Sequence, residues 1–206
     1  MAITVPLHTH LVICTRALLH YNTGMHDENR ENFFTEILKF GLTAVIIVLP
    51  IRLFIAQPFI VSGSSMEPTF EDRQYLIVDE LSYRFESPER SDVIVFRFPK
   101  DESRYLIKRI VGLPGETVAI EGNQIAITTK AGERVALEEP YVVREGNGNA
   151  MTVVLEPDQY FVMGDNRPAS SDSRMWGPLE EGNIVGRAFL RLLPLSALDV
   201  FPGGIN

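Results

Sequence analysis

Histidine and cysteine are absent from this 206-residue sequence after residue 26. The four histidines and the single cysteine all lie in the first part of the chain, at His8, His10, Cys14, His20 and His26. A Ser-His-Asp triad, a cysteine nucleophile and the usual zinc ligands are therefore excluded from the rest of the chain. A single cysteine also excludes a disulfide framework.

Positive charge and nucleotide-binding motifs are scarce as well. The formal net charge is −8, whereas a nucleic-acid-binding domain normally presents a basic face. No Gly-rich phosphate loop of the GxxxxGK type occurs. We therefore expect no nucleic-acid partner, no metal and no cofactor.

One long apolar run stands out, residues 38–58, "LKFGLTAVIIVLPIRLFIAQP". A membrane-spanning helix needs about 20 mostly apolar residues, and Lys39 and Arg52 can extend their charged ends to the two interfaces. The run predicts a transmembrane helix over residues 38–58, with a buried core helix as the alternative. Residues 1–37 then form an N-terminal segment. Met25 begins a polar lead into the helix and is a candidate native start, which would make residues 1–24 non-native.

The pattern changes after residue 58 to short runs rich in β-branched and aromatic residues, separated by Gly, Pro, Asn and Asp. Examples are "RQYLIVDEL", "SDVIVFRF", "MTVVLE" and "IVGRAFLRLL". Such runs are typical of strands, and "VAIEGNQIAI" predicts a hairpin that turns at Gly122-Asn123. Residues 59–206 are therefore predicted to form a mostly β domain, a compact barrel or sandwich.

The stretch "VSGSSMEPTF", residues 61–70, contains three serines. It is either a linker or the site of a nucleophile, and a serine nucleophile needs a neighbouring group that accepts its proton. Without histidine, only a carboxylate or a neutral lysine remains. Of the three lysines that follow the apolar run, Lys100 and Lys130 lie in polar turns, where they stay charged.

Lys108 lies in the apolar run "YLIKRIVGL". Burial would lower its pKa, and a shift from about 10.4 to about 8 requires roughly 3 kcal/mol. The alternative is a strand lysine that faces solvent, because Lys108 and Arg109 point to opposite faces of a strand. Lys108 is the best candidate base, but this chemistry does not distinguish among the three serines.

Four blocks in order now indicate a family. "SGSSMEPTF" after the apolar run, "SDVIVFRFP", "YLIKRIVGLPGE" and "YFVMGDNRPASSDSR" together resemble the type I signal peptidases, the bacterial leader peptidases. The resemblance implies a Ser/Lys dyad protease, active without a cofactor, that removes signal peptides from exported preproteins. It also implies cleavage after small residues, often Ala-x-Ala. Only residues 116–159 separate the last two blocks, which predicts a compact form with a hairpin or two where other members carry a second β domain.

The resemblance also assigns roles to individual residues. The nucleophile would be Ser65, the serine immediately before Met-x-Pro-Thr, and the general base Lys108. The supporting residues would be Ser170, which orients the lysine, Asp165, which pairs with Arg109, and the ion pair of Asp172 and Arg174. Positions that match the walls of the substrate pockets are Phe59, Val61, Met66, Phe70 and Ile107. The oxyanion hole would use the backbone N–H of Ser65, and Gly63 stands where some members place an additional serine donor.

The resemblance further implies a single-pass protein of the bacterial cytoplasmic (inner) membrane, in contact with lipid. Residues 1–37 would be cytoplasmic and residues 59–206 extracytoplasmic, with secretory preproteins as substrates. Two other classes remain open. One is a non-catalytic anchored domain that binds exported chains, and the other is a self-cleaving Ser/Lys repressor-type protease, which the apolar run and the absence of a DNA-binding domain disfavour.

Overall fold

The computed structural model describes residues 27–54, 56–143 and 149–204, and it divides into two compact units, residues 1–51 and 52–206. The first unit contains helix α2 (Asp27–Phe54) up to Ile51. Its large apolar side chains are more than half exposed and lie on all sides of the helix: Phe33, Phe34, Ile37, Leu38, Phe40, Leu42, Val45, Ile46, Ile47 and Val48. Within the described ranges, no helix combines the length and the apolar content that crossing a membrane requires.

The helix bounds differ from the predicted residues 38–58. α2 begins earlier, at Asp27, and ends at Phe54, and the strand β1 (Ala56–Ile60) follows. The reason is strand pairing, since Ala56 to Pro58 pair with Asp79 to Ile77 of the strand β2 (Tyr75–Asp79). Residues 1–24, the candidate non-native segment, lie outside the described residues.

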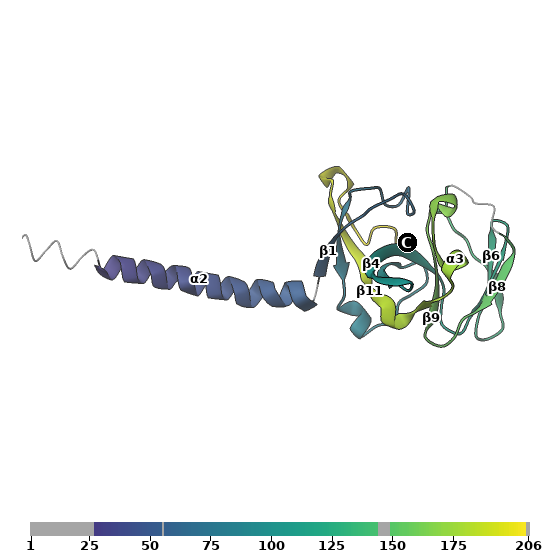
Figure 1. Cartoon of the computed structure of the whole chain (residues 1–206), viewed down its shortest axis with the longest axis horizontal. Helices are drawn as coiled ribbons and strands as arrows, with labels where there is room; N and C mark the ends of the chain where they lie inside the picture. The colour runs from purple at the N-terminus through teal and green to yellow at the C-terminus, as the bar shows by residue number, and fades with distance from the viewer. Residues whose placement is uncertain (1–26, 55, 144–148, 205–206) are drawn as a thin grey trace, which may run out of the picture. The chain divides into compact units, whose positions relative to one another are not determined.

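The second unit is built from two antiparallel sheets (Figure 1). The large sheet has the order β1-β2-β11-β3-β4-β9-β10, with β12 paired to β11. Its further strands are β3 (Val93–Phe98), β4 (Asp101–Gly112), β9 (Gln159–Met163), β10 (Leu179–Glu180), β11 (Ile184–Leu193) and β12 (Asp199–Val200). Short helices connect them: η1 (Ser82–Arg84), η2 (Arg167–Ala169), α3 (Ser173–Trp176), η3 (Glu181–Asn183) and η4 (Leu195–Ala197).

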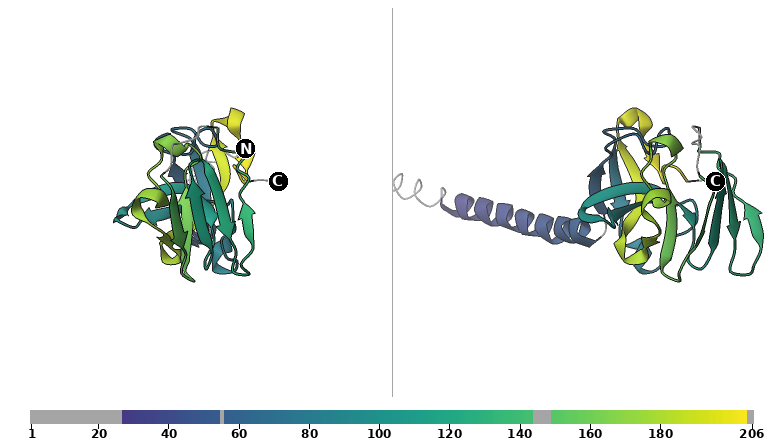
Figure 2. Two further views of the ribbon diagram at one scale, coloured as in Figure 1. Left: turned by 90° about the vertical axis from the view of Figure 1, so that its right-hand side faces the viewer. Right: turned by 45° about the vertical axis from the view of Figure 1, so that its right-hand side comes forward.

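The small sheet has the order β7-β6-β5-β8 and consists of β5 (Thr117–Glu121), β6 (Gln124–Thr128), β7 (Arg134–Ala136) and β8 (Met151–Val154). Figure 2 shows it beside β9, at the side of the domain away from β1. Glu121 pairs with Gln124, which confirms the predicted hairpin turn at Gly122-Asn123. The small sheet, with four strands, lies between the lysine block and the last block, where the sequence predicts a hairpin or two.

Three apolar clusters hold the unit together. One lies between the small sheet and the large one and contains Val118, Ile120, Ile125, Ile127, Val111, Leu155, Phe161 and Met163. A second surrounds residues 61–70, and a third packs beneath β3, β4 and β9 around Phe96 and Tyr160. The first cluster matters for the site because it fixes the small sheet against β4 and β9.

The prediction of a mostly β domain is confirmed, but the domain is not a closed barrel. Among the described residues, the strand path of the large sheet runs from β1 to β10 without closing. The apolar alternation in the sequence identifies which residues form strands, whereas closure depends on which strand edges meet. The short edge strand β10, with two residues, leaves no ladder that could close onto β1.

Candidate active site

Residues 61–70 belong to the loop between β1 and β2, residues 61–74, that presents Ser65. Two backbone bonds close the base of the loop, from Val61 N to Gln74 O and from Arg73 N to Val61 O, each 2.9 Å. Val61, Met66 and Phe70 are buried in the second apolar cluster and anchor the loop from below. Ser65 is therefore held on a fixed loop, and the interpretation of this stretch as a linker does not fit.

Lys108 lies on β4, opposite Ile94 of β3. Its Nζ is 2.6 Å from Ser65 Oγ and 2.7 Å from the backbone oxygen of Ile107. The Lys108 side chain does not face solvent, since the residue is only 3% exposed. The structure thus brings together the serine and the lysine that the sequence motifs singled out.

The surroundings of Lys108 favour its neutral form. Burial lowers the pKa of the Lys108 ammonium to about 8, while the carboxylates of Asp172 and Asp165 act in the opposite direction. A neutral amine has one lone pair and two N–H groups. With the lone pair toward the Ser65 hydroxyl and one N–H toward Ile107 O, the amine can accept the serine proton.

Gly63 and Ser65 provide the backbone part of the site. Gly63 has φ +95°, a conformation that glycine adopts without strain, and its N–H donates to Asp72 Oδ1 at 2.9 Å. Among the described residues, the N–H of Ser65 donates to no backbone oxygen. It remains a candidate donor for a developing oxyanion.

The turn after β9 contacts the nucleophile loop directly. Asn166 donates from its backbone N–H to Ser65 O at 3.1 Å and from Nδ2 to Ser64 O at 3.0 Å. A Cβ on Gly164 would overlap both Ser65 O and Ser170 Oγ, so glycine is required for this close approach. Sequence reasoning did not single out Asn166 or Gly164 within the GDN block.

Ser170 is buried next to this turn. Its Oγ has no hydrogen-bond partner among the described residues, and no hydrogen bond joins it to Lys108. The structure therefore places Ser170 near the backbone of Ser65, through Gly164, without making the predicted contact with the lysine.

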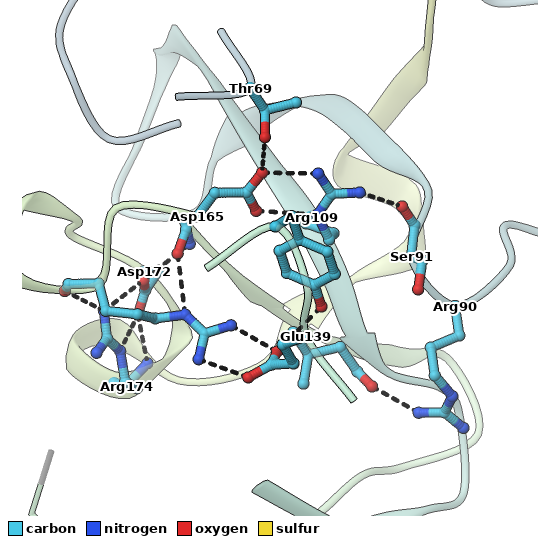
Figure 3. A network of polar contacts seen from close by, with 12 residues as sticks. Thr69, Arg90, Ser91, Arg109, Glu139, Asp165, Asp172 and Arg174 are labelled. Atoms are coloured by element: carbon cyan, nitrogen blue, oxygen red, sulfur yellow. Dashed lines mark hydrogen bonds and ion pairs between the residues drawn. The ribbon is translucent and has the colours of Figure 1, made fainter. Parts of the chain in front are cut away.

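Arg109 and Asp165 form a buried ion pair behind the dyad, which Figure 3 shows together with Thr69. Arg109 Nε and Nη2 donate to the two Asp165 oxygens at 2.9 and 2.6 Å, and Thr69 Oγ1 donates to Asp165 Oδ2 at 2.5 Å. Both ion-pair side chains are 1% exposed. Removing one partner from such a pair typically costs about 3–5 kcal/mol, because the other charge is left buried and unpaired.

Asp172 and Arg174 form a second ion pair at the start of α3. Arg174 donates to both Asp172 oxygens at 2.8 Å, and the Gly164 N–H donates to Asp172 Oδ2 at 3.1 Å. Asp172 also caps α3 by accepting from the backbone N–H of Arg174. The pair fixes the turn that carries Gly164.

A third pair joins Arg167 to Glu139, and sequence reasoning did not anticipate it. Glu139 lies in the segment after β7 and also accepts from Tyr141, whose ring covers Arg109. Residues 138–143, "EEPYVV", carry no pattern that distinguishes them from an ordinary surface loop.

The predicted pocket residues divide into two groups. Val61, Met66 and Phe70 are buried and pack together, with Ile107 partly exposed against them. Phe59 lies outside this cluster and contacts Tyr105 edge-to-face, with ring centroids 5.3 Å apart. Only Phe59 and Ile107 present surface that a peptide could contact directly.

Within the described ranges, no group of three or more His, Cys, Asp or Glu side chains has the arrangement of a metal site.

Comparisons with known proteins converge. Residues 34–193 match the family described as signal peptidase, peptidase S26. A probable signal peptidase I-2 of Synechocystis is 37% identical and covers 80% of this chain and 76% of its own length. The signal peptidase I of Pseudomonas aeruginosa is 31% identical, and the match covers 78% of this chain and 73% of that protein. A crystal structure of a signal peptidase I from Enterococcus faecalis is 30% identical, with a TM-score of 0.43 over 50% of this chain and 97% of that one.

Proposed function

The chain belongs to the signal peptidase family, peptidase S26, and is a peptidase; we propose that it cleaves signal peptides from exported preproteins through a dyad of Ser65 and Lys108. One observation carries this proposal. The Lys108 amine lies 2.6 Å from the Ser65 hydroxyl, buried, with a pKa of about 8. No histidine follows residue 26, so no imidazole competes for the role of base.

The proposed reaction has two halves. Ser65 Oγ attacks the scissile carbonyl carbon while Lys108 Nζ takes the hydroxyl proton. The oxyanion that forms accepts a hydrogen bond from the backbone N–H of Ser65. Lys108 then gives that proton to the leaving amine, and an ester to Ser65 remains. Lys108 next takes a proton from water, which attacks the ester, and Ser65 is restored when the proton returns to its oxygen.

The supporting residues have proposed roles that follow from their contacts. Arg109 and Asp165 hold β4 and the nucleophile loop together through Thr69. Ser170 would orient the lysine by accepting a hydrogen bond from the second N–H of the neutral amine, a contact that requires its buried, unpartnered hydroxyl to move.

Two strand edges suit an extended substrate. β1 is an edge strand. β4 pairs with β9 only from Arg109 onward, so Asp101 and residues 105–108 of β4 pair with β3 alone. A peptide that pairs with one of these edges would present alternate side chains toward Phe59 and Ile107. The space around the dyad would then favour small residues at positions −1 and −3.

The test is cleavage of a preprotein by the purified full-length chain in detergent. A preprotein with an Ala-x-Ala site should yield a product that begins immediately after the second alanine, as N-terminal sequencing would show. Exchanging the alanine at position −1 for tryptophan should lower cleavage at least about 100-fold through steric exclusion. Tight binding without cleavage would instead support a non-catalytic chain-binding domain, and cleavage of both preproteins would refute the proposed specificity.

We further propose that α2 anchors the protein in the bacterial cytoplasmic membrane in a single pass, with the catalytic domain on the extracytoplasmic side. The exposed apolar side chains of α2 support this, and so do those at the C-terminal end of the domain, Leu192, Leu195, Leu198 and Val200. In cells, the chain should resist alkaline extraction from membranes. A protease added outside should degrade residues 59–206, and their protection would reverse the proposed orientation.

A further inference from the structure

A segment of the small sheet reaches the catalytic site. After β7, Leu137 donates to Ile125 O at 2.8 Å and packs on the cluster between the sheets. The chain then carries Glu139, labelled in Figure 3, to Arg167, and Tyr141 to Arg109. We call residues 137–141 the crossing segment.

Glu139 forms a two-point pair with Arg167. Arg167 Nη1 donates to Glu139 Oε2 at 2.8 Å and Nη2 donates to Oε1 at 2.5 Å, with both side chains less than a tenth exposed. Tyr141 OH donates to Glu139 Oε1 at 3.0 Å. Burial and the neighbouring Glu139 raise the pKa of the Tyr141 hydroxyl, so it stays protonated and remains a donor.

Tyr141 also closes one face of Arg109. The Arg109 Cζ lies 3.9 Å from the centre of the Tyr141 ring, close enough for a cation–π contact. The edges of the same guanidinium are occupied by Asp165 and by the carbonyls of Ser91 and Gly203. Arg109 follows Lys108 directly on β4, so fixing Arg109 fixes the backbone that carries the base.

Arg167 acts on the other side of the dyad. Its Nε donates to Gly164 O at 3.1 Å, and Gly164 is the position where a Cβ would overlap Ser65 O and Ser170 Oγ. The crossing segment therefore contacts both arginines, one on the lysine side and one on the serine side.

The charges of this region balance when the lysine is neutral. Three arginine–carboxylate pairs, two of them buried and the third partly buried, lie in this region: Arg109–Asp165, Arg167–Glu139 and Arg174–Asp172. Loss of the Glu139 charge would leave one guanidinium without its partner near the site. A nearby uncompensated positive charge disfavours the ammonium form of a lysine.

We propose that Glu139 and Tyr141 are positioning residues for the serine–lysine chemistry, acting through Arg167 and Arg109. The role rests on the proposed function of the dyad. It assigns the small sheet a part in catalysis that its distance in sequence from Ser65 and Lys108 does not suggest.

The test compares Glu139→Gln with Glu139→Asp in the full-length chain. In Glu139→Gln, an amide NH₂ faces a guanidinium donor, so we expect kcat to fall about 10- to 100-fold through misplacement of the dyad, with KM within about threefold. The kinetic pKa of Lys108 should also decrease. Glu139→Asp keeps the carboxylate and should recover part of kcat. The matched control is Glu121→Gln, which removes an exposed carboxylate of the same sheet, 3.8 Å from Arg134, and should change neither quantity.

A second measurement does not depend on peptidase activity. The rate at which an amine-reactive acylating reagent modifies Lys108, followed by mass spectrometry across pH, reports the lysine titration directly. The titration should move to lower pH in Glu139→Gln even if the wild-type chain cleaves no preprotein. Tyr141→Phe is a milder variant, because it loses only the hydroxyl and keeps the ring that packs on Arg109. We expect it to lower kcat three- to tenfold. Unchanged kcat and unchanged Lys108 titration in folded Glu139→Gln and Tyr141→Phe would overturn the proposal.

Discussion

Replacing Ser65 with alanine is expected to lower the rate of preprotein cleavage by at least about 10⁴-fold. The variant has no oxygen to form the ester, and loss of the nucleophile of a serine protease removes nearly all catalysis except what binding and the oxyanion hole retain. Product formation with the Ala-x-Ala preprotein, followed by gel and mass spectrometry over a long time course, would measure the residual rate.

The chain supplies matched controls for this variant. Ser62 and Ser64 lie in the same loop and are exposed, so Ser62→Ala and Ser64→Ala should retain activity within a few-fold. The three variants together identify the nucleophile among neighbouring hydroxyls. An active Ser65→Ala enzyme would rule out the assignment of Ser65 as the nucleophile. If Ser64→Ala were inactive at the same time, the nucleophile would be Ser64.

Replacing Lys108 with arginine is expected to lower kcat by about 10³- to 10⁴-fold. A guanidinium stays charged at any pH at which the protein is folded, so no lone pair is available for the serine proton, and loss of a general base costs about 10²- to 10⁴-fold. The control is Lys100→Arg, since Lys100 is exposed in a turn, and it should be neutral. Retained activity in Lys108→Arg would show that another group takes the proton.

The pH dependence of the wild-type enzyme follows from the same residue. Lys108 must be neutral to act as base, so kcat/KM should rise with pH through about 8 and then level off. A profile that stays flat to about pH 10 would contradict the role of Lys108.

Stability should follow the same titration. The pKa of Lys108 falls from 10.5 to about 8 on folding, so the unfolded chain binds more protons between these values. The free energy of unfolding should therefore increase with pH across this window, and below it the buried lysine costs about 3 kcal/mol. Urea unfolding of the full-length chain at pH 7 and pH 10, beside Lys108→Met, isolates this contribution because the methionine variant has no amine to titrate.

Much of the fold could be predicted from local patterns. The strand runs and the hairpin at Gly122-Asn123 follow from side-chain alternation and turn residues, which act over a few positions. The end of α2 was misplaced because residues 56–58 pair with β2, a long-range interaction that overrides their apolar composition. Whether the large sheet closes into a barrel was not predictable for the same reason, because closure depends on whether distant strand edges meet in three dimensions, and here they do not.

The candidate site was predictable where its residues lie in motifs. Ser65 and Lys108 come from separate motifs, and the structure brings them within 2.6 Å, although their roles remain predictions. Glu139 and Tyr141 were not predicted because their partners, Arg167 and Arg109, lie about 30 residues away on either side in sequence. The short segment that carries Glu139 and Tyr141 contains no sequence pattern that indicates contact with a buried arginine side chain.

The strand order has a consequence for how the enzyme is made. β11 lies between β2 and β3, and Gly203 supplies a carbonyl to Arg109, so parts of the framework around the dyad follow both Ser65 and Lys108 in the sequence. A nascent chain that already contains both dyad residues still lacks the framework that joins them. We therefore expect the dyad to reach its final geometry only after β11 and Gly203 have joined the fold.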